Sequence, residues 1–84
     1  MKKILVIEDE EDLNQTLSFN LENEGYKVTS ALKGSEALEI LENASPPDLV
    51  ILDLMLPDMP GLDICRYIRS VSYTHLRAHE TNSH

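Results

Sequence analysis

Short apolar runs alternate along the chain with apolar residues at helical spacing. Continuous runs of mostly branched residues at 4–7 and 49–52 predict strands covered on both faces, as in a parallel sheet. Residues 26–31 alternate more, which predicts an edge strand with one wetter face. Three helices are predicted by apolar residues at helical spacing, namely Leu13, Leu17 and Leu21, then Ala37, Ile40, Leu41 and Ala44, then Ile64, Cys65 and Ile68.

The predicted order is strand, helix, strand, helix, strand, helix. This alternation indicates a parallel α/β sheet with right-handed crossovers. In such sheets, functional sites form at the carboxyl ends of the strands. Glu8 and Asp9 directly follow the first strand, and Asp53 ends the third. We therefore expect any site to lie at these three acids.

Three carboxylates at one end of a sheet, with no Lys or Arg beside them in sequence, repel one another unless they are protonated or bridged by a cation. Oxygen ligands suit Mg²⁺, which would also neutralise an incoming phosphoryl group. A carboxylate placed there can act as a nucleophile and form an aspartyl-phosphate. Taken singly, each acid is also typical of a helix start or a loop, and spacing alone leaves both interpretations open.

Composition narrows the class of partner. The 84 residues allow one small domain, and the net charge of −8 argues against direct contact with nucleic acid. The charge fits a divalent cation or a basic protein surface, and it equally fits plain solubility. Cys65 is the single cysteine, so no intrachain disulfide forms, and no apolar run reaches membrane length. We expect a cytoplasmic protein without a membrane segment.

Two segments carry a resemblance to a known family. Residues 3–10 (KILVIEDE) and 47–61 (PDLVILDLMLPDMPG) resemble the receiver domain of bacterial two-component response regulators. The similarity covers residues 2 to about 70, with Gly25-Tyr26 between the motifs. The resemblance implies a flavodoxin-like, doubly wound parallel sheet.

The resemblance also implies roles for particular residues. Asp53 matches the phosphoacceptor, Asp9 the acid that binds Mg²⁺ directly, and Glu8 its acidic neighbour, which often acts through water. Met55 matches the residue whose backbone carbonyl completes the metal shell. The implied function is a phosphoacceptor signalling domain, not an enzyme, that receives its phosphoryl group from a sensor histidine kinase. The sequence of residues 54–69 resembles that of regulators with a winged-helix DNA-binding domain. DNA would then be contacted only through an output domain outside this chain.

The resemblance stops near residue 70. The family has five strands, with a Thr or Ser ending the fourth and a Lys ending the fifth. We expect only the first three strands and helices here, with the third strand left as an open edge of the sheet. The hydroxyl residue of the fourth strand, the Lys of the fifth strand and the family's dimerisation face would then all be missing. Neither Thr74 nor Thr81 follows an apolar strand, so neither is predicted to replace that hydroxyl.

The final segment differs in character. Residues 71–81 resemble translated transposase sequencing adapter. We therefore predict a partial receiver domain at 2–70 and a non-native tail at 71–84. Deletion of this tail is expected to leave the behaviour of residues 1–70 unchanged. His75 and His79 have a spacing that on a helix could form half of a metal site, but no further ligand is placed.

Three other functions compete with the receiver assignment. A Mg²⁺-dependent phosphohydrolase of the haloacid dehalogenase type would need a second Asp where this chain has Met55. An ATPase fragment would need a Gly-rich phosphate loop, which the sequence lacks. An inert structural α/β fragment is the third alternative. Acetyl phosphate separates them, since a receiver gains a stable adduct, an enzyme turns over and a scaffold does neither.

Overall fold

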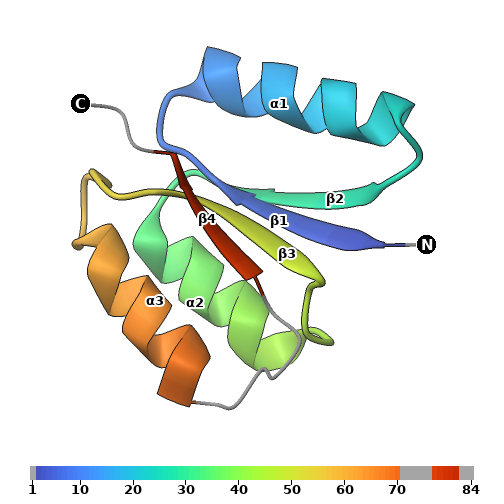
Figure 1. The fold of residues 1–84 in the computed structure, drawn as a ribbon. Helices are drawn as coiled ribbons and strands as arrows, with labels where there is room; N and C mark the ends of the chain where they lie inside the picture. The colour runs from blue at the N-terminus through green and yellow to red at the C-terminus, as the bar shows by residue number, and fades with distance from the viewer. Residues whose placement is uncertain (1, 71–76, 82–84) are drawn as a thin grey trace.

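A parallel sheet with helices on both faces forms the molecule. The computed structural model describes residues 2–70 and, for the backbone only, residues 77–81. The elements are β1 (Lys3–Ile7), α1 (Glu11–Asn23), β2 (Lys27–Ala31), α2 (Gly34–Asn43), β3 (Leu49–Asp53), α3 (Gly61–Ser70) and β4 (Arg77–Thr81). The strand order is β2-β1-β3-β4, with α1 on one face of the sheet and α2 and α3 on the other (Figure 1). The predicted doubly wound, flavodoxin-like class is confirmed.

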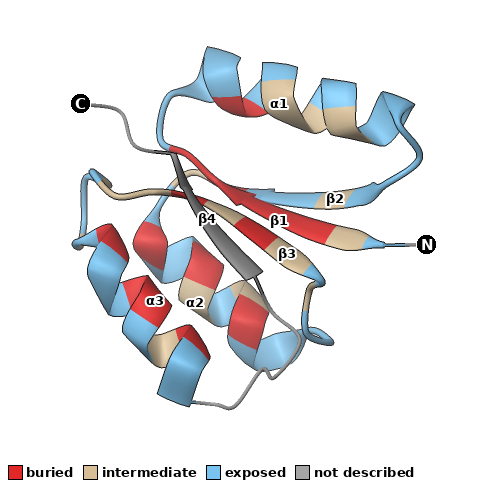
Figure 2. Ribbon diagram, in the orientation of Figure 1, coloured by how far each residue is buried: buried red, intermediate tan, exposed pale blue. Residues whose placement is uncertain are grey.

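β1 is the most deeply buried strand. Its residues Ile4 to Ile7 are at most 3% exposed, because β1 lies between β2 and β3 and has helices on both faces (Figure 2). In β3, only Val50 and Leu52 are fully buried, and Leu49, Ile51 and Asp53 are half-buried. The continuous apolar runs therefore predicted both strands, but the second face is fully covered only at β1.

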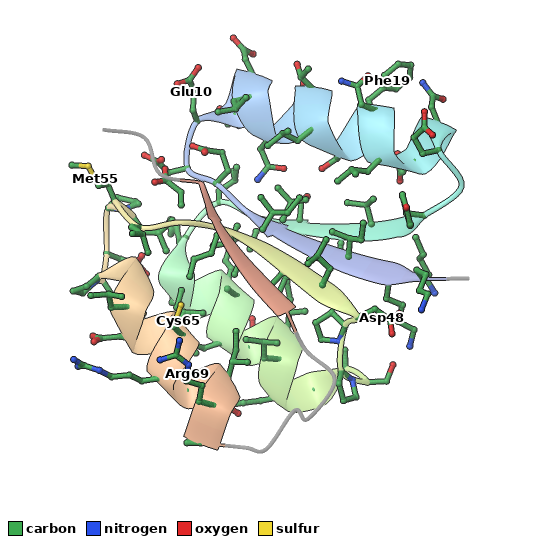
Figure 3. The ribbon with its side chains drawn as sticks, in the orientation of Figure 1. Glu10, Phe19, Asp48, Met55, Cys65 and Arg69 are labelled. Carbon is green, nitrogen blue, oxygen red and sulfur yellow. The ribbon has the colours of Figure 1, made fainter. Side chains whose placement is uncertain are left out.

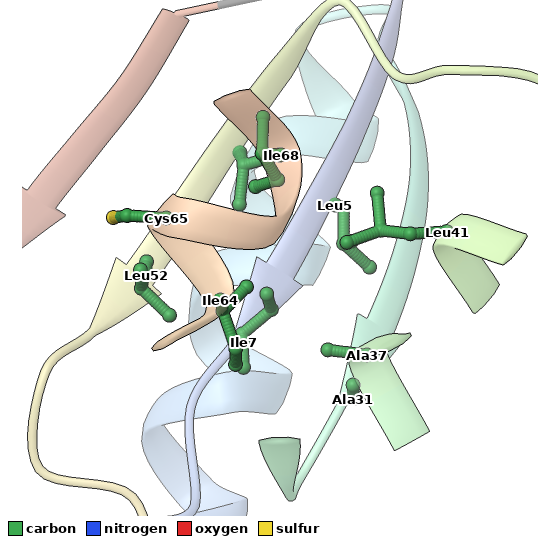
Figure 4. Packing of buried hydrophobic residues seen from close by; sticks show 10 residues of the cluster. Leu5, Ile7, Ala31, Ala37, Leu41, Leu52, Ile64, Cys65 and Ile68 are labelled. Atoms are coloured by element: carbon green, nitrogen blue, oxygen red, sulfur yellow. The ribbon is translucent and has the colours of Figure 1, made fainter. Parts of the chain in front are cut away.

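The main hydrophobic core fills the space between the sheet and the α2 and α3 helices (Figure 4). It contains Leu5 and Ile7 of β1, Ala31 of β2, Val50 and Leu52 of β3, Ala37 and Leu41 of α2, and Ile64, Cys65 and Ile68 of α3. Every α3 residue in this set was predicted to be apolar and inward-facing. Helix α1 covers the other face and contributes no residue to this cluster.

A fourth strand lies where we expected an open edge. β4 pairs in parallel with β3, from Leu49 beside Arg77 to Asp53 beside Thr81. The expectation of an open β3 edge is therefore wrong. Strand pairing uses backbone N–H and C=O groups that every non-proline residue carries, so a segment without an apolar run can still occupy a sheet edge.

The same register places Thr81 at the end of β4 beside Asp53, although the residues of β4 form no apolar run. The expectations for Thr74 and His75, and for the side chain of His79, concern groups outside the part of the chain that the structure describes. Among the described helices, none is long and apolar enough to cross a membrane.

Candidate functional site

Three carboxylates meet at the carboxyl end of the sheet. β1 and β3 are parallel neighbours with Ile7 beside Leu52, so the residues that follow them emerge at the same edge. Glu8, Asp9 and Asp53 each offer a carboxylate oxygen, and these oxygens lie within 4.8 Å of one another. The structure thus brings together the three acids singled out from the sequence. They line an open pocket together with Leu13 and Met55, among others.

Glu8 is the buried member of the group. Its side chain is 7% exposed, and Oε2 accepts a hydrogen bond from the backbone N–H of Glu10 at 3.0 Å. Burial raises the pKa of the Glu8 carboxyl, and the nearby charges of Asp53 and Asp9 raise it further, against the opposing effect of the Glu10 N–H. Ionisation of Glu8 is therefore less favourable in the folded protein than in water, and positive charge brought to the site would ease it.

In the described part of the chain, no Lys or Arg forms an ion pair with Glu8, Asp9 or Asp53. The one ion pair there joins Arg66 to Asp63 within α3, at 3.6 Å, with both side chains largely exposed. The three carboxylates thus have no basic partner in this part of the protein, which leaves protonation or a bound cation to relieve their repulsion.

Asn14 holds the backbone beneath the site and was missed in the sequence analysis. Its side-chain amide is buried and donates to the carbonyl oxygens of Glu8 at 2.9 Å and Ala31 at 3.0 Å. Leu13, part of the apolar spacing that predicted this helix, is 42% exposed, whereas Asn14 beside it is buried against the sheet. A polar residue one position from an apolar stripe is the signal that could have identified it.

Asp53 is oriented by the loop that follows β3. Its Oδ1 accepts a hydrogen bond from the backbone N–H of Met55 at 3.0 Å. The side chain of Met55 is 75% exposed and points away from the loop (Figure 3). This arrangement places the Met55 backbone next to the acids and leaves its side chain at the entrance of the pocket.

The same loop folds back on its own start at Gly61. The Gly61 N–H donates to the carbonyl of Leu54 at 3.0 Å, and Met55 forms an antiparallel bridge with Pro60. A Cβ at residue 61 would lie 2.6 Å from Leu54 Cα and 2.8 Å from the carbonyl oxygen of Asp53. Gly61 is therefore needed for the approach of α3 to the end of β3.

This fold and acid cluster agree with the comparison to known families. Residues 4–78 match the model of the response regulator receiver domain, and the chain belongs to that family. The match extends past residue 70, the domain boundary predicted from the sequence.

Individual relatives are similar over most of this chain. It is 47% identical over 68 residues to the alkaline phosphatase synthesis transcriptional regulatory protein PhoP of Bacillus subtilis, covering 81% of this chain and 28% of that protein. It is 49% identical over 69 residues to the phosphate regulon transcriptional regulatory protein PhoB of Rhizobium meliloti, covering 82% of this chain and 30% of that protein. The chain thus spans less than a third of the length of these relatives.

A solved structure shows the same fold. The response regulator protein TrrA from Thermotoga maritima, in complex with Mg²⁺-BeF, superposes with a TM-score of 0.86 at 35% identity. The superposition covers 100% of this chain and 73% of that one.

Proposed function

We propose that this chain is the phosphoacceptor domain of a two-component response regulator, in which Asp53 takes a phosphoryl group with the help of Mg²⁺. The observation that carries the proposal is the meeting of Glu8, Asp9 and Asp53 within 4.8 Å at the ends of two neighbouring parallel strands. Membership of the receiver family and the Mg²⁺-BeF complex of TrrA support it.

The residues at the site fit Mg²⁺. The donors are carboxylate oxygens, which this ion prefers, and Glu8 has a raised pKa that added positive charge would lower. Glu8, Asp9, Asp53 and the backbone carbonyl of Met55 would hold the ion. When bound, it would supply charge neutralisation to the acids and to an incoming phosphoryl group.

Asp53 would act as the nucleophile. Its Oδ1 is engaged by the Met55 N–H, so Oδ2 is the oxygen left to attack phosphorus. As the new O–P bond forms, the bond from phosphorus to the donor breaks, and the electron pair leaves with the donor. The donor would be a phosphohistidine of a sensor kinase or a small acyl phosphate, and the domain would carry the group rather than turn over a substrate.

The protein that carries this domain would be a cytoplasmic transcription regulator. This proposal rests on the similarity to PhoP and PhoB, both described as transcriptional regulatory proteins. DNA would be bound by a separate output domain, because the described surface here is acidic and the whole chain has a net charge of −8. A haloacid dehalogenase-type hydrolase is not favoured, since Met55 stands where that chemistry needs an acid.

Labelling with acetyl phosphate and Mg²⁺ tests the proposal in the protein that carries this receiver domain. The unchanged protein should gain one phosphoryl group, and Asp53→Asn should gain none. Asp48→Asn is the matched control, because Asp48 lies at the opposite end of β3 (Figure 3) and should leave labelling intact. Labelling that persists in Asp53→Asn and maps to another residue would overturn the assignment of Asp53.

A further inference from the structure

The N-terminus of α2 is capped by a residue from a different part of the chain. Asp58, in the loop between β3 and α3, accepts the N–H of Gly34 on Oδ1 at 2.8 Å and the N–H of Ser35 on Oδ2 at 2.9 Å. Lys33, the residue in the N-cap position, makes no side-chain cap. The first two free amides of α2 are thus satisfied by one carboxylate that lies 24 residues from Gly34 in sequence.

An apolar contact accompanies this cap. Gly34 is buried, and a Cβ built on it would lie 2.7 Å from the Sδ of Met59, the residue after Asp58. The side chain of Met59 is itself packed against the core. The tip of the β3–α3 loop is therefore joined to the first turn of α2 by two carboxylate hydrogen bonds and by close packing.

The tip of this loop is also tied to the acid site. Pro60 bridges to Met55, and Gly61 bonds to Leu54, so only residues 56–59 lie between the bridged positions. Met55 in turn donates its N–H to Asp53 Oδ1 at 3.0 Å. A displacement of Asp58 and Met59 would accordingly move the Met55 backbone and the orientation of the Asp53 carboxylate.

We propose that Asp58 is a positioning residue that, by capping α2, holds the backbone of Met55 and the carboxylate of Asp53 in place for Mg²⁺. This inference rests on the proposed function of the acid site. Asp58 does not belong to the group of acids that could share the ion, so its effect passes through the loop. By thermodynamic reciprocity, Mg²⁺ binding should also tighten the cap and slow hydrogen exchange at the Gly34 and Ser35 amides.

Three variants of the full chain separate a positioning role from a simple effect of charge. Asp58→Ala removes both the charge and the cap, whereas Asp58→Asn removes the charge but keeps one oxygen, which can accept one of the two N–H groups. Asp48→Ala is the matched control, since exposed Asp48 also accepts a backbone N–H, from Lys3 at 2.8 Å, at the far end of β3. The readouts are hydrogen exchange of the Met55 amide without metal, and Mg²⁺ affinity from an NMR titration of the amides.

We expect Asp58→Ala to speed Met55 exchange and to weaken Mg²⁺ binding about fivefold, the factor that corresponds to loss of a typical cap. Asp58→Asn should weaken Mg²⁺ binding less than Asp58→Ala does, because one of the two cap hydrogen bonds can persist. Asp48→Ala should change neither readout.

Two results would overturn the inference. Equal weakening of Mg²⁺ binding by Asp58→Asn and Asp58→Ala, with Met55 exchange unchanged in both, would show that only the charge matters. Faster exchange at Gly34 and Ser35 with no change at Met55 in Asp58→Ala would show that the cap serves α2 alone. Failure of the unchanged chain to bind Mg²⁺ would instead count against the proposed function, and exchange at Met55 would still decide the role of Asp58.

Discussion

The side-chain amide of Asn14 donates to the backbone carbonyl of Glu8 at 2.9 Å, and thereby ties α1 to the strand end that carries two of the three site acids. The same amide nitrogen also donates to the carbonyl oxygen of Ala31, at the end of β2, with an N···O distance of 3.0 Å. The Glu8 N–H also donates to the Ala31 carbonyl. One buried side chain therefore fixes the ends of two neighbouring strands and the start of the loop that holds Asp9.

Replacement of Asn14 by Ala should destabilise the fold. The Glu8 carbonyl would lose the side-chain donor that satisfies it, and the Ala31 carbonyl would keep only the Glu8 N–H. Leaving a buried polar group unsatisfied costs about 1–3 kcal/mol. Urea unfolding followed by circular dichroism measures the change in the free energy of unfolding. Asn20→Ala is the matched control, because Asn20 is exposed on the same helix and its loss should change stability by less than about 0.5 kcal/mol. Equal effects of the two substitutions would contradict the role assigned to Asn14.

Asp9 should contribute to metal affinity and not to stability. It is exposed and belongs to a cluster of three acids, so Asp9→Ala should relieve repulsion and raise the free energy of unfolding of the metal-free protein by up to about 1 kcal/mol. The same change should largely abolish the stabilisation that Mg²⁺ gives in a thermal melt. Glu11→Ala, in the first turn of α1 and outside the cluster, should keep the Mg²⁺ effect. Strong unfolding of Asp9→Ala with unchanged Mg²⁺ binding would reverse this interpretation.

The sequence predicted the elements that depend on continuous or periodic apolar residues. The runs of β1 and β3 and the stripe of α3 each allow one arrangement, because any other would expose several branched side chains to water. The meeting of Glu8, Asp9 and Asp53 also followed from the sequence, since carboxyl ends of parallel strands share one edge of the sheet.

Features that depend on single polar contacts could not be predicted in this way. The burial of Asn14 in place of Leu13 is set by how α1 rotates against β1 and β2. The cap by Asp58 joins segments that are distant in sequence, and no periodicity marks such a pair. Strand β4 has no apolar pattern in its sequence, and its backbone pairs in parallel with β3.

Asp58 should make stability sensitive to acid. The N–H groups of Ser35 and Gly34 lower the pKa of the Asp58 carboxyl, so its contribution is present at neutral pH and is lost as the pH falls through the lowered pKa. The affected window therefore lies below about pH 4, the ordinary range of an aspartate. Urea unfolding at several pH values should show a shallower loss of stability in acid for Asp58→Asn than for the unchanged chain. Identical acid slopes for the two proteins would argue against any stabilising effect of the ionised cap.

Deletion of residues 71–84 gives the last prediction, and β4 changes what we expect from it. The origin of this segment remains a prediction, which a genomic read through codon 71 would test. Whatever its origin, β4 pairs along the whole of β3, so deletion should expose the backbone groups of a largely apolar strand. Exposed strand edges of this kind pair with other chains, so the truncated protein should self-associate in sedimentation velocity experiments. The amides on the β4-facing side of β3 should also lose protection from hydrogen exchange. Removal of residues 82–84 alone, which leaves β4 intact, should preserve the behaviour of the unchanged chain. A truncated protein that stays monomeric, with the same amide protection in β3, would show that β4 does not stabilise the sheet.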